Sequence, residues 1–281
     1  MTTTVSAGAG TLHQPAADRT TSSSGSVQSV TRALSLLEFL AARRDGATAK
    51  QIASHLDLAL PSAYHLLTTL IDTGYVVHLV QQHRYGLGYR IRVLEEGLAR
   101  QLEAPAAVVD AIRRLHVEAD AAAYYAVYRD VDVVIAHVVD SERRPRVRVL
   151  DVGFHEAAHA TAFGKVMLAA MSAEHRDAYI ARVGLRRCTS RTIVDPTTLD
   201  RHLSHVQTAQ LAVEFGEFQD GLACLAAPVR SSDGTVVASV AVSMPCAEFA
   251  ARRWAVEQSL RRGATVVTKA IRAADAKAHS G

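Results

Sequence analysis

A chain of 281 residues, 49% of them hydrophobic and 21% charged, is long enough for two domains and has the composition of a soluble globular protein. The formal net charge of +3 permits nucleic-acid binding without requiring it, so charge alone identifies no partner. No apolar run is long enough to cross a bilayer and no apolar signal-peptide core is present, which predicts a cytoplasmic protein without membrane contact.

The N-terminal region is expected to begin as a disordered tail and to continue as three short helices. Residues 1–25 are rich in Thr, Ser, Ala and Gly, as disordered tails are. Helical spacing then predicts a first helix with one apolar stripe, made of Val30, Ala33, Leu34, Leu37 and Ala41. Thr48 and Gln51 have capping-box spacing for a second helix, and Pro61 suits the first turn of a third. A tight turn between the last two makes this a helix-turn-helix.

A β-hairpin should follow the third helix. The apolar run 75–80, the polar tip 81–84 and the short run 85–87 have the pattern of two strands and a turn, which predicts a winged helix-turn-helix domain over residues 26–88. In such a domain the third helix enters the major groove of DNA. Its solvent face is expected to carry Ser62, Tyr64, His65, Thr68 and Thr69. The alternative is a winged helix that binds protein instead.

A linker helix is predicted over residues 89–104, before Pro105 interrupts the helical pattern. Its apolar stripe consists of Ile91, Leu94, Leu98 and Leu102. The stripe must be buried, either on its own chain or against a second subunit. We favour the second interpretation, because dimeric helix-turn-helix proteins place two recognition helices one turn of DNA apart.

The remaining chain, residues 105–275 before a short tail at 276–281, has the pattern of an α+β domain. A helix at 106–119 is followed by a hairpin of residues 124–128 and 133–139 and by an alternating strand at 146–152. Helices are predicted at 164–171, 173–183 and 196–209, then strands at 222–229 and 235–244 joined through Asp233 and Gly234. A final helix carries Leu260, Ala264, Val267 and Ile271 on one side.

Two segments of this domain point to a sensor. Residues 160–167, ATAFGKVM, have the pattern of a loop that enters an apolar helix, with Thr161 as N-cap and Gly164 allowing close backbone approach. Exposed amides at such a helix start attract anions. Residues 221–229, GLACLAAPV, are typical of a buried strand. Side by side, the two segments would enclose a small apolar pocket with an anion-attracting rim.

These segments resemble the effector domain of the IclR family of bacterial transcription regulators, and the N-terminal half agrees. Residues 26–40, SVQSVTRALSLLEFL, resemble the family's opening helix, residues 61–75, PSAYHLLTTLIDTGY, its recognition helix, and residues 85–88, YGLG, the end of its wing. The resemblance runs from about residue 26 to 271. It implies a GAF-like effector domain and a ligand-responsive repressor that binds a double-stranded DNA operator as a homodimer or homotetramer.

The resemblance also assigns residues to both binding sites. Arg32 and Arg84 match the opening helix and the wing and would contact phosphates, while Leu60 and His65 replace the basic residue and the Arg that relatives usually carry. The effector positions, beside Thr161 and Gly164, are Ala162, Phe163, Glu214, Leu222, Cys224, Ala241 and Ser243. Glu214 stands where Asp is usual, and Phe163 is bulkier than its counterparts.

The effector is expected to be a small organic acid. Its carboxylate would point toward the amides of residues 161–165, where the helix dipole favours negative charge. Its far end would carry a hydroxyl or another donor for Glu214, because an ionised carboxylate there repels a second acid.

Two other classes of protein compete with a regulator. An enzyme would use Cys224 with His155 or His159, but no spacing fixes such a nucleophile pair. A signalling module would keep the sensor without binding DNA. Cys188, Cys224 and Cys246 are odd in number and widely spaced, so neither a disulfide framework nor a metal site is expected, and no cofactor is implied.

Overall fold

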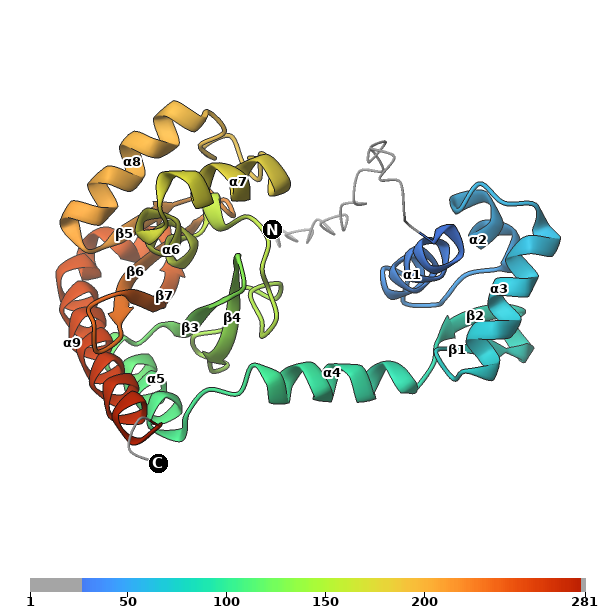
Figure 1. The fold of residues 1–281 in the computed structure, drawn as a ribbon, viewed down its shortest axis with the longest axis horizontal. Helices are drawn as coiled ribbons and strands as arrows, with labels where there is room; N and C mark the ends of the chain where they lie inside the picture. Colours follow the sequence, from blue (N-terminus) through green and yellow to red (C-terminus); the bar gives the residue numbers. More distant parts are fainter. Residues whose placement is uncertain (1–26, 279–281) are drawn as a thin grey trace, which may run out of the picture. The chain divides into compact units, whose positions relative to one another are not determined.

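The computed structural model describes residues 27–278, which form two compact units, one up to Gly97 and one from Leu98 onward. Figure 1 labels the helices and strands of each unit. The predicted N-terminal tail, with Ser26, and the last three residues lie outside the described part. Residues 276–278 continue the final helix, so the C-terminal tail begins later than predicted.

The first unit is a winged helix-turn-helix. It contains α1 (Gln28–Ala41), α2 (Ala49–His55), α3 (Leu60–Asp72), β1 (Val76–Leu79), the 3-10 turn η1 (Val80–Gln82) and β2 (Arg84–Leu87). The two strands pair antiparallel. Thr48 and Gln51 form the predicted capping box, and Pro61 lies in the first turn of α3. The same three helices and hairpin were predicted from local signals, because caps and prolines act within a few residues of their own position.

The predicted apolar stripe of α1 is wrong in part. Val30 and Leu34 are exposed, whereas the core receives Leu36, Phe39 and Leu40, with Leu67 of α3 packed against them. Apolar residues occupy more than one face of α1, and periodicity alone does not say which face its partners cover. The apolar residues on the inner side of α3 are all buried or half-buried: Ala63, Leu66, Leu67, Leu70 and Ile71.

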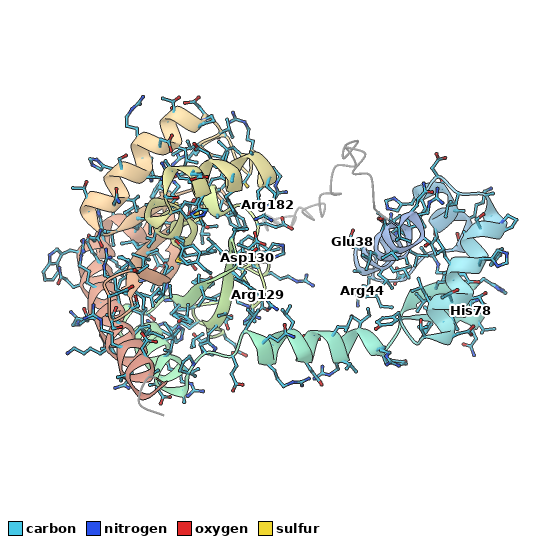
Figure 2. The ribbon with its side chains drawn as sticks, in the orientation of Figure 1. Glu38, Arg44, His78, Arg129, Asp130 and Arg182 are labelled. Atoms are coloured by element: carbon cyan, nitrogen blue, oxygen red, sulfur yellow. The ribbon has the colours of Figure 1, made fainter. Side chains whose placement is uncertain are left out.

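A five-stranded antiparallel sheet forms the centre of the second unit. Its strands are β3 (Ala122–Arg129), β4 (Asp132–Val139), β5 (Ala212–Phe215), β6 (Leu222–Arg230) and β7 (Val236–Pro245), in the spatial order β4-β3-β7-β6-β5. The β3–β4 turn lies at Asp130 (Figure 2), between the two strands predicted for this hairpin. Arg182 binds Asp132, at the start of β4, at 2.6 Å. β5 is a strand that sequence patterns did not reveal, since four residues carry little periodicity.

Helices cover both faces of this sheet (Figure 1). α5 (Ala106–Ala119) and the long α9 (Cys246–Ala278) pack on one face. α6 (Ala162–Ala170) packs on the other, together with α7 (Ala173–Val183) and α8 (Pro196–Ala209). Alternate residues of β6 therefore enter different cores, which is why its sequence is apolar without interruption. α4 (Arg90–Gln101) precedes α5. Within residues 27–278, no helix has the length and hydropathy needed to span a membrane.

The strand predicted at residues 146–152 is wrong, because this segment is a loop. Two of its charged residues bind one another, since Arg146 donates to Asp151 at 2.6 Å, and Arg146 also donates to Asp140 at 2.9 Å. Gly153 and Phe154 bond to the backbone of β4, through Ile135. Leu150 and Val147 pack on the α6 side of the sheet, whereas Val149 and Val152 are exposed.

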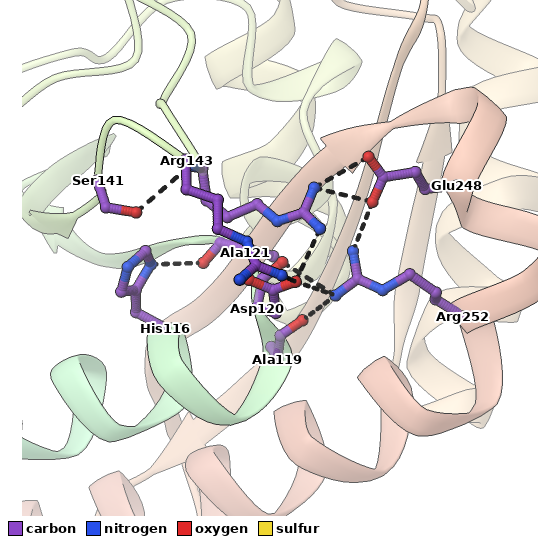
Figure 3. A network of polar contacts seen from close by, with 9 residues as sticks. His116, Ala119, Asp120, Ala121, Ser141, Arg143, Glu248 and Arg252 are labelled. Carbon is purple, nitrogen blue, oxygen red and sulfur yellow. Dashed lines mark hydrogen bonds and ion pairs between the residues drawn. The ribbon is translucent and has the colours of Figure 1, made fainter.

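A network of charges fastens the same loop to both helices of the opposite face (Figure 3). Arg144 donates to both carboxylate oxygens of Glu248 at 2.9 Å and to Asp120 at 2.7 Å. Arg252 donates to Glu248 at 2.7 Å and to the carbonyls of Ala119 and Asp120, at 2.6 and 2.9 Å. The hydrogen bond from Arg144 is the main cause that lowers the pKa of Asp120 to about 2.

The start of α6 is fixed by a close backbone contact. The 3-10 turn η2 (Ala158–Ala160) lies against Gly164, and a Cβ atom added at that glycine would be 2.2 Å from the carbonyl oxygen of Ala158. Such a distance is far inside van der Waals contact, and a backbone atom cannot rotate away as a side chain does. Only glycine fits at this position.

We expect Gly164→Ala to lower the free energy of unfolding by about 3 kcal/mol, because one methyl group must push two backbone segments apart. Urea denaturation of the full chain measures this. Gly263→Ala in α9 is the matched control, since its new methyl meets only the flexible side chain of Leu115 at 3.3 Å and should change stability by less than about 1 kcal/mol. Equal losses in both variants would contradict the close-contact explanation.

Candidate functional site

The exposed face of α3 carries all five side chains predicted to contact DNA. Ser62, Tyr64, His65, Thr68 and Thr69 are exposed, and Ala63, Leu67 and Leu70 on the opposite side are buried. Thr69 donates its hydroxyl proton to the carbonyl of His65 at 3.0 Å, so its oxygen remains available as an acceptor. This face offers hydroxyl and imidazole groups and no permanent positive charge.

The two arginines predicted to contact phosphates are half-buried. Arg84, at the start of β2, donates to the carbonyl of Gly46 at 3.0 Å and so ties the wing to the turn before α2. Arg32 lies on α1. Part of the guanidinium of Arg84 is therefore used structurally, which leaves fewer of its N–H groups for a phosphate.

The apolar stripe of the linker is partly exposed and partly buried within the chain itself. Leu94 and Leu98 of α4 are 55% and 42% exposed, and Ile91 is half-buried. Leu102 is only 6% exposed and belongs to the core of the second unit. The prediction that all four residues form one free seam is therefore wrong for Leu102, which lies beyond the end of α4 and packs with α5.

Strand register brings the predicted effector residues together on the α6 face. Glu214 of β5 lies opposite Cys224 of β6, which lies opposite Ser243 of β7. Leu222 and Ala241 lie on the same face, next to this row. Ala162 and Phe163, at the start of α6, pack in the same cluster. Residues 80 positions apart in the sequence thus form one site.

The amides at the start of α6 are not exposed, contrary to the sequence-based expectation. Every residue from Ala160 to Ala169 is buried. Thr161 is the predicted N-cap, since its hydroxyl accepts from the amide of Gly164 at 3.3 Å, and its carbonyl accepts from the amide of Lys165 at 2.9 Å. The reason is the close packing of η2, which local sequence signals do not reveal.

Glu214 is fully buried and incompletely hydrogen-bonded. Its Oε1 accepts from the amides of Glu217 and Phe218, the second at 2.9 Å, while its Oε2 has no partner within residues 27–278. Burial raises the pKa of this carboxyl group. Burial also raises the pKa of the Cys224 thiol beside it, well above the usual value, which opposes the thiolate that a nucleophilic enzyme needs.

Lys165 is the principal residue that sequence reasoning missed. It is 0% exposed, and its ammonium group forms an ion pair with Glu217, in the turn between β5 and β6. Desolvation lowers its pKa. The available signal was a single lysine within the otherwise apolar segment AFGKVMLAA, which periodicity treats as a surface position.

Unpartnered polar atoms gather around this lysine. The electrostatic neighbours of Lys165 include Glu214, His159 and His202. Glu214 Oε2, Glu217 Oε2, His159 Nδ1 and His202 Nε2 are buried, and none has a hydrogen-bond partner in the described part of the chain. Buried polar groups are normally hydrogen-bonded, so such a cluster is typical of a site that receives a polar ligand or water. Burial lowers the pKa of His202 to about 4.

Aromatic rings and a cleft complete the site. Phe154 contacts Phe163 and Phe218 edge to face, with ring centroids 6.4 and 5.5 Å apart. A cleft of about 240 Å³ opens beside Leu222 and Ser243 and is also lined by Arg143 and Arg144. The two histidines considered for catalysis bind backbone carbonyls, His155 that of Gly153 and His159 that of Arg186. Among residues 27–278, no group of three or more His, Cys, Asp or Glu side chains is placed to hold a metal ion.

Comparison with known proteins identifies the family. Residues 101–269 match the family model described as "Bacterial transcriptional regulator IclR C-terminal", and residues 29–79 match the "IclR helix-turn-helix domain". The chain belongs to the IclR family. It is a DNA-binding transcription regulator, and its relatives are regulators rather than enzymes.

Three similar proteins illustrate the relationship. The HTH-type transcriptional repressor AllR of Klebsiella pneumoniae is 25% identical over 84% of this chain and 86% of its own. The crystal structure of a transcriptional regulator from Rhodococcus sp. RHA1 has 27% identity and a TM-score of 0.69 over 88% of this chain and 98% of its own. An IclR homolog from Microbacterium hydrocarbonoxydans, complexed with 4-hydroxybenzoate, has 22% identity and a TM-score of 0.67 over 87% of this chain and 99% of its own.

Proposed function

We propose that this IclR-family regulator is a repressor of a metabolic operon whose operator binding is controlled by a small organic acid. The observation that carries the proposal is the row of Glu214, Cys224 and Ser243 beneath α6, a buried polar row with an unpartnered carboxylate oxygen. A buried row with an unsatisfied acceptor favours a small ligand that supplies a hydrogen-bond donor. The name of the Klebsiella relative, a repressor, supports the sign of regulation.

The proposed effector is a monocarboxylic acid with a hydroxyl group at its far end. The hydroxyl would donate to Glu214 Oε2, and the carboxylate would lie at the α6 end of the site. The rings of Phe154, Phe163 and Phe218 suit an aromatic spacer. The 4-hydroxybenzoate bound by the Microbacterium homolog has this chemistry and supports the proposal.

We expect specific, symmetric and only moderately salt-sensitive DNA binding. The α3 face is uncharged and Arg84 is partly engaged, so few phosphates are neutralised, and the slope of log affinity against log salt is about 0.9 per contacted phosphate. Fluorescence anisotropy on DNA from the protein's own promoter region measures both properties. Affinity equal to that for scrambled DNA would contradict an operator-reading role.

We also propose that Leu94 and Leu98 join two copies of the chain. The double variant Leu94→Asp with Leu98→Asp should lower the oligomeric state and abolish binding to an operator with two half-sites, because a carboxylate in an apolar seam loses its hydration. Analytical ultracentrifugation checks the first effect and anisotropy the second. Val117→Asp, at an exposed apolar position of α5, is the matched control and should change neither. An unchanged dimer in the double variant would place the seam elsewhere.

The hydroxyl group of the effector should be recognised by Glu214. We expect Glu214→Gln to weaken 4-hydroxybenzoate about tenfold and benzoate much less, because hydrogen bonds to an ionised acceptor are roughly twice as strong as neutral ones. Titration calorimetry with this matched pair of acids measures the difference. Glu156→Gln, which removes an exposed carboxylate paired with Arg186, is the control. Equal losses for both acids would show that the orientation is wrong.

A further inference from the structure

The ion pair between Lys165 and Glu217 is buried next to the effector positions Glu214 and Cys224, and this buried polar region is called the chamber. Lys165 lies on α6, directly after Gly164, and Glu217 follows Glu214 by three residues. A buried ammonium group without a counterion costs several kcal/mol, so the protein must supply an anion when no ligand does. Glu217 is that anion.

Glu217 holds Lys165 with only half of its carboxylate. Its Oε1 accepts from the ammonium group, while Oε2 is buried and unpartnered among the described residues. A ligand that carries hydrogen-bond donors in addition to its carboxylate would satisfy these buried acceptors better. The pairing with Glu217 is therefore adequate to fold the domain without being the best that Lys165 can form.

The backbone of Glu217 is anchored independently of its side chain. Its amide donates to Glu214, and its carbonyl accepts from the hydroxyls of Thr192 at 2.7 Å and Thr189 at 3.3 Å. Rotation of the side chain alone can therefore remove the carboxylate from Lys165, and the turn need not move.

A second cation, Arg191, lies beside Gly216, the residue before Glu217. The guanidinium of Arg191 stacks on the Phe215 ring at 5.3 Å, and its Nε and Nη1 lie 3.9 Å from the Cβ position that Gly216 would have. Arg191 is exposed, so a carboxylate that reaches it leaves the buried chamber and regains water.

We propose that Glu217 is a built-in substitute for the effector's carboxylate: an incoming monocarboxylate binds Lys165, and the Glu217 side chain turns outward toward Arg191. This inference rests on the proposed function and names the charged group that binds the acid. Removing a residue that contacts the ligand normally lowers the affinity for that ligand. Glu217 instead competes with the ligand for Lys165, so removing its charge should raise the affinity.

The test is a double-mutant cycle at Lys165 and Glu217 with benzoate as the probe, which has the carboxylate and no hydroxyl for Glu214. Calorimetry at about pH 6 favours the protonated form of this lysine, whose pKa burial lowers, more than neutral pH does. Glu217→Gln preserves the shape and one acceptor, and we expect it to bind benzoate at least about tenfold more tightly than the wild type. Lys165→Met combined with Glu217→Gln should lose this gain. Glu156→Gln should bind as the wild type does.

The outcomes separate the two proposals. If the wild type binds benzoate and Glu217→Gln binds it equally or more weakly, Glu217 is not a substitute for the ligand, while the organic-acid proposal stands. If neither binds any acid, the proposed function fails and the inference fails with it. Should Glu217→Gln not fold, Glu217→Asp keeps the charge on a shorter arm, and an unchanged benzoate affinity in that variant overturns the inference.

Discussion

The effector domain depends on a sheet that is covered by helices on both faces. Each strand then sends alternate side chains into two separate dry cores, and any polar group among them must find a partner inside the protein. The core on the α5 and α9 face consists mainly of apolar residues. On the α6 face lie Glu214, Lys165 and Glu217, whose mutual contacts leave two carboxylate oxygens, one of Glu214 and one of Glu217, without a partner in the described part of the chain. The ligand chemistry that we propose follows from this difference between the faces.

The DNA-binding unit has fewer charged groups to attract DNA than a strongly basic domain has. Its recognition helix presents hydroxyls and an imidazole, which both donate and accept hydrogen bonds but add little long-range attraction. Each copy alone would therefore hold DNA weakly. The joining of two copies through Leu94 and Leu98, as we propose, converts the second contact into an intramolecular one and compensates for the missing charge.

Particular residues show how far sequence reasoning reaches. The winged helix was predicted almost element by element, because Thr48 and Pro61 act on their immediate neighbours. The effector positions on the sheet were placed through resemblance to the IclR family. The loop at 146–152 and the inward lysine were not predicted. In both cases a charged side chain binds a carboxylate that only the folded structure brings close. Arg146 binds Asp140 and Asp151, and Lys165 binds Glu217. The alternation of charged and apolar residues in a sequence does not tell whether a charged side chain will face such a partner or water.

The fastening by Arg144, just before the loop at 146–152, has a physiological consequence if the effector is the organic acid that we propose. A weak acid that enters a cell also releases protons, so the regulator should respond to the anion and ignore the acidity. Hydrogen bonds from Arg144 lower the pKa values of Asp120, to about 2, and of Glu248. The stabilisation that Asp120 provides is fully present above its ordinary pKa and is lost only as the pH falls toward 2. The loop at 146–152 therefore stays fastened throughout the acidification that the proposed effector would bring.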